Sequence, residues 1–93
     1  MSFCEMLPIF KALADETRLQ ILGMLENGQM CACRINDQFK CSQPTISYHM
    51  KLLTEAGLVT ATRDGALMCY ELAPGACEAL KTFADAAKRD EAE

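Results

Sequence analysis

The pair Asp64-Gly65 is the sequence feature that most restricts the fold of this chain. It separates two β-like runs, residues 58–63 (LVTATR) and residues 66–72 (ALMCYEL). Asp-Gly between two such runs is a strong signal for a β-hairpin with a two-residue turn. The segments on either side have apolar residues at helical spacing. The sequence therefore predicts a mainly α-helical domain that contains one β-hairpin near its C-terminal end.

Helix start and stop signals predict where the helices lie. Ser42 is a good N-cap with Pro44 in the first turn behind it, and Ala56-Gly57 is a typical ending. The predicted helices cover residues 3–13, 15–27, 31–39, 42–55 and 74–90. The order α-α-α-α-β-β-α is that of a winged helix-turn-helix, and 93 residues are enough for one domain, residues 1–93.

The same spacing predicts which apolar side chains form the core. The expected inward faces are Leu7, Phe10 and Leu13; Leu19, Ile21, Leu22 and Leu25; Ile35 and Phe39; Ile46, Met50 and Leu53; and Cys77, Leu80, Phe83, Ala84 and Ala87.

The predicted helix 42–55 has the character of a DNA-recognition helix. Its polar face is opposite the apolar stripe. Gln can pair with adenine in the major groove, Ser and Thr suit several base edges, and Lys suits phosphates. His49 flanks the stripe and can either contact a phosphate or satisfy the core. Arg63, near the hairpin tip, can lie along the minor groove. The predicted DNA-binding residues are Lys40, Ser42, Gln43, Thr45, Ser47, Tyr48, His49, Lys51 and Arg63.

The overall charge favours a competing interpretation. A net charge of −4 and a pI of about 4.9 argue against nucleic-acid binding, since phosphate contacts need positive charge. The helix could then be an ordinary amphipathic one, in a winged-helix module that binds no DNA. However, residues 40–63 contain Lys40, Lys51 and Arg63 against the single acid Glu55. Local DNA binding, strengthened by dimerisation, therefore stays the preferred hypothesis.

Two cysteines, Cys31 and Cys33, come just before the predicted recognition helix. On a regular α-helix, residues two apart point about 200° away from each other. Both sulfurs can therefore hold one ion only if the helix start unwinds or is not fully helical. Thiolates without a neighbouring histidine favour soft ions such as As(III), Sb(III), Cd(II), Pb(II) or Cu(I). We expect a thiol-based sensing site here, and expect Cys41, Cys69 and Cys77 to be small buried core residues.

Several segments together carry a family resemblance. They are residues 10–19 (FKALADETRL), 42–50 (SQPTISYHM), 53–58 (LTEAGL) and 63–72 (RDGALMCYEL). With these segments the chain resembles the ArsR/SmtB family of bacterial metalloregulatory repressors, and residues 30–33 resemble its arsenic-responsive branch.

The resemblance implies a homodimer that binds operator double-stranded DNA and leaves it when ligand binds. It also implies that helices 3–13 and 74–90 form the dimer interface. The arsenic-responsive pattern has a third cysteine where this chain has Asn36. The third metal ligand is then either Cys4, supplied by the partner subunit as in some relatives, or absent, which leaves a two-thiol site. Cys4 is the expected choice.

Other function classes are less well supported. A thiol oxidoreductase is disfavoured because the chain has no Cys-x-x-Cys in a βαβ pattern, so we expect no enzyme. A thiol redox or persulfide sensor on the same DNA-binding fold stays an alternative. The N-terminus lacks the character of a signal peptide and no apolar run is long enough to span a membrane, so a cytoplasmic location is expected.

Overall fold

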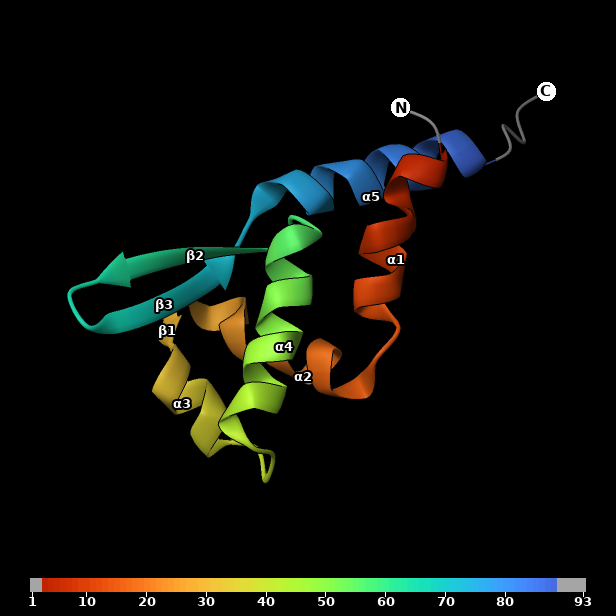
Figure 1. Ribbon diagram of the computed structural model, residues 1–93. Helices are drawn as coiled ribbons and strands as arrows, with labels where there is room; N and C mark the ends of the chain where they lie inside the picture. Colours follow the sequence, from red (N-terminus) through yellow and green to blue (C-terminus); the bar gives the residue numbers. More distant parts are fainter. Residues whose placement is uncertain (1–2, 89–93) are drawn as a thin grey trace.

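The computed structural model describes residues 3–88, which form a group of helices with a small sheet at one side (Figure 1). The elements are a 3₁₀-helix Phe3–Met6, α1 Leu7–Leu13, α2 Glu16–Met24, a 3₁₀-helix Leu25–Asn27, β1 Met30–Cys31, α3 Ala32–Asp37, α4 Gln43–Glu55, β2 Val59–Asp64, β3 Leu67–Leu72 and α5 Pro74–Ala87. This is the predicted winged helix-turn-helix, with α3 and α4 as the helix pair and β2–β3 as the wing.

Local capping explains where α2 and α4 begin. Asp15 is extended before α2 and its carboxylate accepts the Arg18 backbone N–H at 3.0 Å. Ser42 does the same for α4, where its hydroxyl accepts the Thr45 backbone N–H at 3.3 Å. Both bonds satisfy backbone donors that a helix leaves free in its first turn. Gly57 follows α4 with a φ of 78°, a conformation that favours glycine.

The sheet has the strand order β1–β3–β2, with both pairs antiparallel. Asp64 pairs with Leu67, so the turn is Gly65-Ala66, one residue later than the predicted Asp64-Gly65. Gly65 has a φ of 63°, and no non-glycine residue described has a positive φ, which fits a type II′ turn. Strand β1 was not predicted. It is only two residues long, too short to show a β periodicity in sequence.

The short strand β1 corrects the prediction for the third helix. The helix was expected over residues 31–39, but Cys31 is extended (φ −77°, ψ 153°) and α3 covers only Ala32–Asp37. The reason is that Cys31 pairs with Cys69 of β3, which holds its backbone in the sheet. Residues 38–39 continue as a hydrogen-bonded turn rather than as helix.

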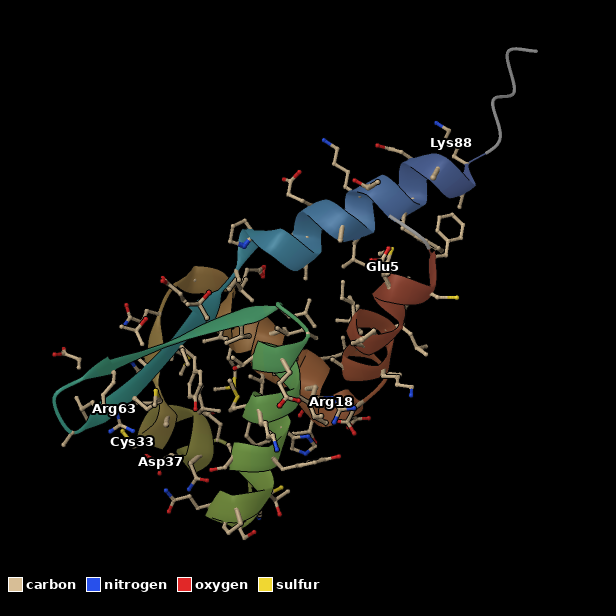
Figure 2. All side chains as sticks on the ribbon, turned by 45° about the horizontal axis from the view of Figure 1, so that its top comes forward. Glu5, Arg18, Cys33, Asp37, Arg63 and Lys88 are labelled. Atoms are coloured by element: carbon tan, nitrogen blue, oxygen red, sulfur yellow. The ribbon has the colours of Figure 1, made fainter. Side chains whose placement is uncertain are left out.

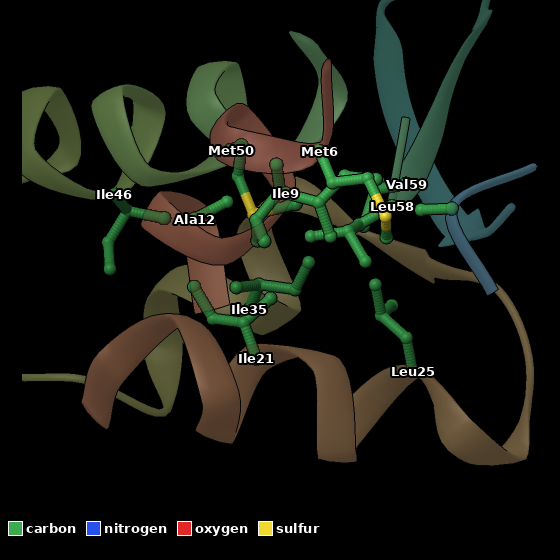
Figure 3. Close-up of a cluster of buried hydrophobic side chains, with 12 residues drawn as sticks. Met6, Ile9, Ala12, Ile21, Leu25, Ile35, Ile46, Met50, Leu58 and Val59 are labelled. Carbon is green, nitrogen blue, oxygen red and sulfur yellow. The ribbon is translucent and has the colours of Figure 1, made fainter. Parts of the chain in front are cut away.

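The core lies between α1, α2, α3 and α4 (Figure 3). The α4 stripe of Ile46, Met50 and Leu53 is buried as predicted. The buried hydrophobic residues are Met6, Ile9, Ala12, Ile21, Leu25, Ile35, Ile46, Met50, Leu53, Leu58, Val59, Cys69 and Ala76.

Two predicted core positions in the first two helices are wrong. Leu7 is 51% exposed and Leu19 is 52% exposed. In the first helix, Met6, Ile9 and Ala12 form a second apolar stripe beside Leu7, and periodicity cannot decide which stripe faces inward. Leu19 precedes the fully buried Ile21 by two positions, which puts it on the opposite side of α2.

Helix α5 runs along one end of the domain beside the 3₁₀-helix Phe3–Met6 (Figure 1). Phe83 packs edge-on against Phe3 and Phe10, with ring centroids 4.7 Å and 5.1 Å apart. Of the predicted inward face, Leu80 and Phe83 are partly buried, whereas Cys77, Ala84 and Ala87 are exposed. The predicted last residues of this helix, 89 and 90, lie outside the described residues.

Within residues 3–88, no helix has the length and apolar character needed to cross a membrane.

The contrast between Ile21 and Leu19 gives a stability prediction. Ile21→Ala should lower the free energy of unfolding by about 2–5 kcal/mol, because it leaves a cavity in a fully buried site. Leu19→Ala, in the same helix, should cost about 0.5 kcal/mol or less. Urea denaturation at one fixed protein concentration measures both. Equal losses in the two variants would contradict the assignment of the buried face.

Candidate functional site

The polar face of α4 is free of the protein interior, as predicted. Gln43, Thr45, Ser47, Tyr48 and Lys51 are all exposed, and the Tyr48 side chain is 57% exposed although it is large and aromatic. The preceding turn also presents Lys40 and Ser42 to solvent. These side chains can reach a ligand as large as a DNA duplex without any rearrangement of the core.

Arg63 lies on β2 one position before the strand ends, opposite Met68 of β3. Its side chain is exposed at the outer part of the wing, on the side where Cys33 and Asp37 lie (Figure 2). The hairpin thus carries a positive charge out from the body of the domain.

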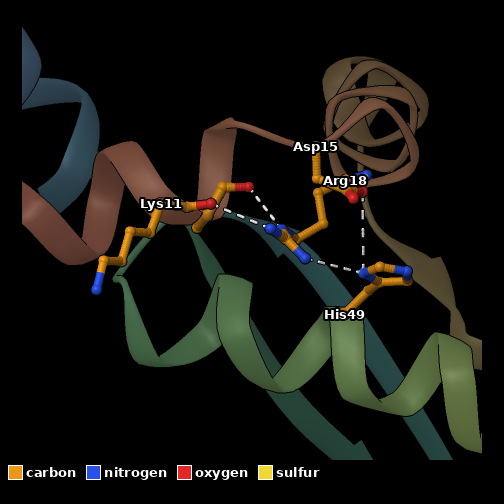
Figure 4. Close-up of polar contacts among 5 residues, drawn as sticks. Lys11, Asp15, Arg18 and His49 are labelled. Carbon is orange, nitrogen blue, oxygen red and sulfur yellow. Dashed lines mark hydrogen bonds and ion pairs between the residues drawn. The ribbon is translucent and has the colours of Figure 1, made fainter.

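His49 is the one residue of the predicted DNA set whose side chain turns inward. Its Nδ1 accepts a hydrogen bond from Arg18 Nη1 at 3.1 Å, since a guanidinium has only donors (Figure 4). Asp15 Oδ2 also lies 4.0 Å from His49 Nδ1. Two roles were considered for His49, a phosphate contact and a hydrogen bond inside the protein. The structure favours the hydrogen bond inside the protein.

Arg18 joins three helices and was missed by the sequence reasoning. Besides His49 of α4, its guanidinium donates to the carbonyl of Ala12 at 2.7 Å and to that of Lys11 at 3.0 Å (Figure 4). These are C-terminal carbonyls of α1, which need an outside donor. The Arg18 backbone N–H, helped by the Arg18 charge, holds the pKa of Asp15 below its ordinary value despite partial desolvation. The only signal for Arg18 in the sequence was its place in the 10–19 segment.

The sulfurs of Cys31 and Cys33 lie 2.8 Å apart. They meet because Cys31 is extended at the end of β1 while Cys33 is in the first turn of α3. The condition set by helix geometry, that the start is not fully helical, is met here. No unwinding is needed to bring the two sulfurs together.

The contact between the two thiols shifts their pKa values in opposite directions. The hydrogen bond from Cys33 lowers the pKa of Cys31, and the backbone N–H groups of Arg34 and Cys33 lower it further. The same contact raises the pKa of Cys33, with desolvation and the negative charge of Cys31 adding to the effect. Cys31 is therefore the thiol of the pair that ionises first, and the thiolate is the form that reacts with electrophiles and binds soft ions.

A cavity of about 410 Å³ joins the thiol pair to the predicted DNA-contacting elements. Cys31 and Cys33 form one wall, the inner edge of α4 forms another, and the wing forms the third. The residues of α4 and the wing that line it are Gln43, Ile46, Ser47, Met50, Arg63, Ala66, Leu67, Met68 and Tyr70. Asn36 also lines the cavity, and its side-chain oxygen is buried without a hydrogen-bond partner among the described residues.

Cys4 does not join the thiol pair within one chain. It is exposed and lines a separate cavity of about 560 Å³ between α1 and α4, together with Arg18 and Tyr48. Among the described residues, no group of three or more His, Cys, Asp and Glu side chains is placed to hold a metal ion. A third thiolate from Cys4 therefore has to come from another subunit.

The remaining cysteines divide into two kinds. Cys69 is buried as predicted, at 9% exposure. The expectation of burial is wrong for Cys41 and Cys77, which are both exposed. Cys41 lies in the turn before α4, and Cys77 lies on the outer side of α5, so neither packs against the core of its own chain.

Fold and site together define a winged helix-turn-helix protein that carries a thiol pair beside α4, its predicted recognition helix. The sequence profile described as "Bacterial regulatory protein, arsR family" matches residues 15–61. The chain belongs to the ArsR family, whose members are DNA-binding transcriptional regulators and not enzymes.

Individual relatives agree with this assignment. The chain is 46% identical over 72 residues to the arsenical resistance operon repressor of Staphylococcus aureus, covering 77% of this chain and 69% of that protein. It is 44% identical over 75 residues to the repressor of the same name from Escherichia coli K12, covering 80% and 64%. A crystal structure titled as a possible transcriptional regulator for arsenical resistance matches with a TM-score of 0.75 at 33% identity, covering 87% of this chain and 84% of that one.

The lowered pKa of Cys31 gives a prediction. At neutral pH, Cys31 should react with iodoacetamide faster than an ordinary thiol, because its lowered pKa leaves more of it as thiolate. Cys33→Ala removes the donated hydrogen bond, so the midpoint of Cys31 alkylation should move to higher pH. Peptide mass spectrometry measures the reaction at Cys31 alone. Cys41→Ala is the matched control. An unmoved midpoint in Cys33→Ala would contradict the claim that the contact with Cys33 lowers the pKa of Cys31.

Proposed function

We propose that this chain is a transcriptional repressor of arsenical resistance that releases operator double-stranded DNA when Cys31 and Cys33 capture a trivalent arsenical. One observation carries the proposal: the paired sulfurs line the same cavity as Gln43 and Ser47 of α4 and Arg63 of the wing. The names of the two curated relatives, both arsenical resistance operon repressors, support it.

DNA binding is assigned to the exposed face of α4 and to the wing. Gln43, Thr45, Ser47 and Tyr48 would read base edges in the major groove, and the N-cap Ser42 would support them. Lys40, Lys51 and Arg63 would contact phosphates or the minor groove. Since His49 is turned toward Arg18, its contribution would be to position α4 rather than to contact DNA.

Two copies are needed for firm binding to a palindromic operator. A net charge of −4 gives each chain few phosphate contacts, and a homodimer doubles them. We assign the dimer interface to the N-terminal segment and α5, the elements predicted over residues 3–13 and 74–90. Phe3 and Leu7 are each 51% exposed there, and Ala84 and Ala87 on α5 are also exposed. Covering such apolar side chains would stabilise a dimer.

The ligand preference follows from the donor atoms. Two thiolates with no histidine among the residues that line the cavity suit As(III) and Sb(III), with Cd(II), Pb(II) and Cu(I) as weaker candidates. Capture would convert a hydrogen-bonded pair into a bridged one and change the spacing of Cys31 and Cys33. Cys31 is paired with β3 of the wing, and Cys33 is in α3, whose Ile35 is buried in the same core cluster as the apolar stripe of α4. A change in spacing would therefore shift both DNA-contacting elements.

The short distance between the sulfurs also favours a second candidate function. Two thiols 2.8 Å apart could be oxidised to a disulfide by a peroxide, with two electrons and two protons going to form water. The chain would then sense oxidation. A persulfide, RSSH, could form the same disulfide while it is reduced to RSH and H₂S. Mass spectrometry of the peroxide-treated protein tests this, because it requires an internal link between Cys31 and Cys33.

The assignment of α4 gives a DNA prediction. Gln43→Ala and Thr45→Ala should each weaken specific binding by about 1–3 kcal/mol, the value of a good base contact, without changing the unfolding curve. Fluorescence anisotropy with a site selected from random-sequence DNA measures the loss. Gln20→Ala, an exposed glutamine on α2, is the matched control. If both α4 variants bind like the wild type, α4 is not the recognition helix.

The thiol pair gives a sensing prediction. Cys31→Ser and Cys33→Ser should still bind the selected site but should no longer leave it when arsenite is added, because ligand and DNA contact different residues. Cys41→Ser and Cys77→Ser, which remove exposed thiols elsewhere, should respond like the wild type. Normal release by Cys31→Ser would mean that the pair is not the sensing site.

A further inference from the structure

The side-chain oxygen of Asn36 is the one buried side-chain polar atom that lacks a hydrogen-bond partner within residues 3–88. A buried amide oxygen without a partner costs free energy, and native proteins rarely keep one without a reason. Asn36 is in α3, three residues and thus nearly one helical turn after Cys33. It lines the same cavity as both sulfurs. The residue that carries the unsatisfied acceptor is therefore part of the wall around the thiol pair.

An arsenical captured by two thiols keeps one further group. Arsenous acid, As(OH)₃, reacts with the two thiols to form two As–S bonds, and two of its hydroxyls leave as water with the two thiol protons. The third hydroxyl stays on arsenic and is a hydrogen-bond donor. No oxidation state changes in this exchange.

We propose that the Asn36 side-chain oxygen accepts a hydrogen bond from this retained hydroxyl. The ligand class is then a trivalent oxyacid of arsenic or antimony, held by two sulfurs and one hydrogen bond. This inference rests on the proposed function of the thiol pair and deepens it. It differs from the expectation of a third thiolate from Cys4.

The chemistry of an amide supports a hydrogen bond rather than coordination. A neutral carbonyl oxygen is a hard donor and a poor ligand for a soft ion that thiolates already hold. Rotation about the terminal torsion of asparagine is nearly free, so the oxygen can turn toward the cavity that Asn36 lines. The hydroxyl would then satisfy an acceptor that the protein itself leaves unsatisfied, which favours the bound state.

A methylated arsenical separates this role from a structural one. Methylarsonous acid, CH₃As(OH)₂, gives up both hydroxyls to two thiols and keeps only its methyl group. It has no hydroxyl left to donate to Asn36. The two probes therefore form the same two As–S bonds and differ in the one group that Asn36 would recognise.

The experiment compares arsenite and methylarsonous acid on the whole protein bound to its selected DNA site. Asn36→Leu keeps the size of the side chain and removes the acceptor. The concentration of arsenite for half-release should rise about tenfold, as for one lost hydrogen bond. The concentration of methylarsonous acid should stay unchanged, which also shows that the variant is folded. An equal change for both probes, or none for arsenite, overturns the proposal.

X-ray absorption at the arsenic edge provides the second measurement. The wild type with arsenite should show two sulfurs and one oxygen around arsenic, and Asn36→Cys should show three sulfurs. Three sulfurs in the wild type that fall to two in Cys4→Ser would overturn the proposal in favour of Cys4. Failure of the proposed function itself gives a different result from failure of this inference. In that case Cys31→Ser would still release DNA normally with both arsenicals.

Discussion

The burial of one stripe on α4 determines how the rest of the domain is arranged. Ile46, Met50 and Leu53 are each at most 4% exposed, and they pack among side chains from the N-terminal segment, α1, α2, α3 and β2 (Figure 3). Turning α4 about its axis would bring polar side chains into this core, at a cost of several kcal/mol. Burial of the stripe therefore fixes the opposite face outward, and the identity of the exposed side chains can change without changing the fold. A single packing constraint thus both holds the domain together and exposes the face of α4 that is proposed to contact DNA.

Arg18 holds α4 in position relative to α1. Its guanidinium binds two carbonyls at the end of α1 and His49 on α4, so a displacement of either helix breaks a hydrogen bond to a charged group. Bonds of this kind contribute about 1.5–3 kcal/mol each. Since α1 is assigned to the dimer interface, Arg18 would transmit the dimer geometry to the recognition helix. In a dimer that binds two half-sites, the distance between the two recognition helices decides the fit to the operator. Under the proposed function, Arg18 would affect DNA binding by positioning α4.

Local signals in the sequence were sufficient for the order of the elements, whereas features that depend on tertiary contacts were not predictable. Ser42, Gly57 and the hairpin act through neighbouring residues, and the predicted fold and the stripe on α4 are confirmed. Strand β1 exists only because β3 lies beside it, and it moved Cys31 out of the predicted helix. That same pairing brings the two sulfurs together. From helix geometry alone we could predict only that the sulfurs meet if the start of the helix is not fully helical. The exposure of Leu7, Leu19, Cys41 and Cys77 depends on which of two apolar faces packs inward, and periodicity does not carry that information.

Under the proposed function, the arsenical and the DNA bind next to the same cavity, and each must change the affinity of the other by the same factor. If an arsenical at Cys31 and Cys33 lowers the affinity for DNA by some factor, bound DNA lowers the affinity for the arsenical by the same factor. Release requires a ligand that binds the free form more tightly, and a hundredfold preference corresponds to about 2.7 kcal/mol. Two As–S bonds are more than strong enough for capture, but they form in either state. Only contacts that differ between the two states drive release. Groups that link the thiol pair to α4 and the wing are therefore better placed to decide the response than the sulfurs are. The residues that line the cavity, with Asn36 beside the sulfurs and Arg63 on the wing, are such groups.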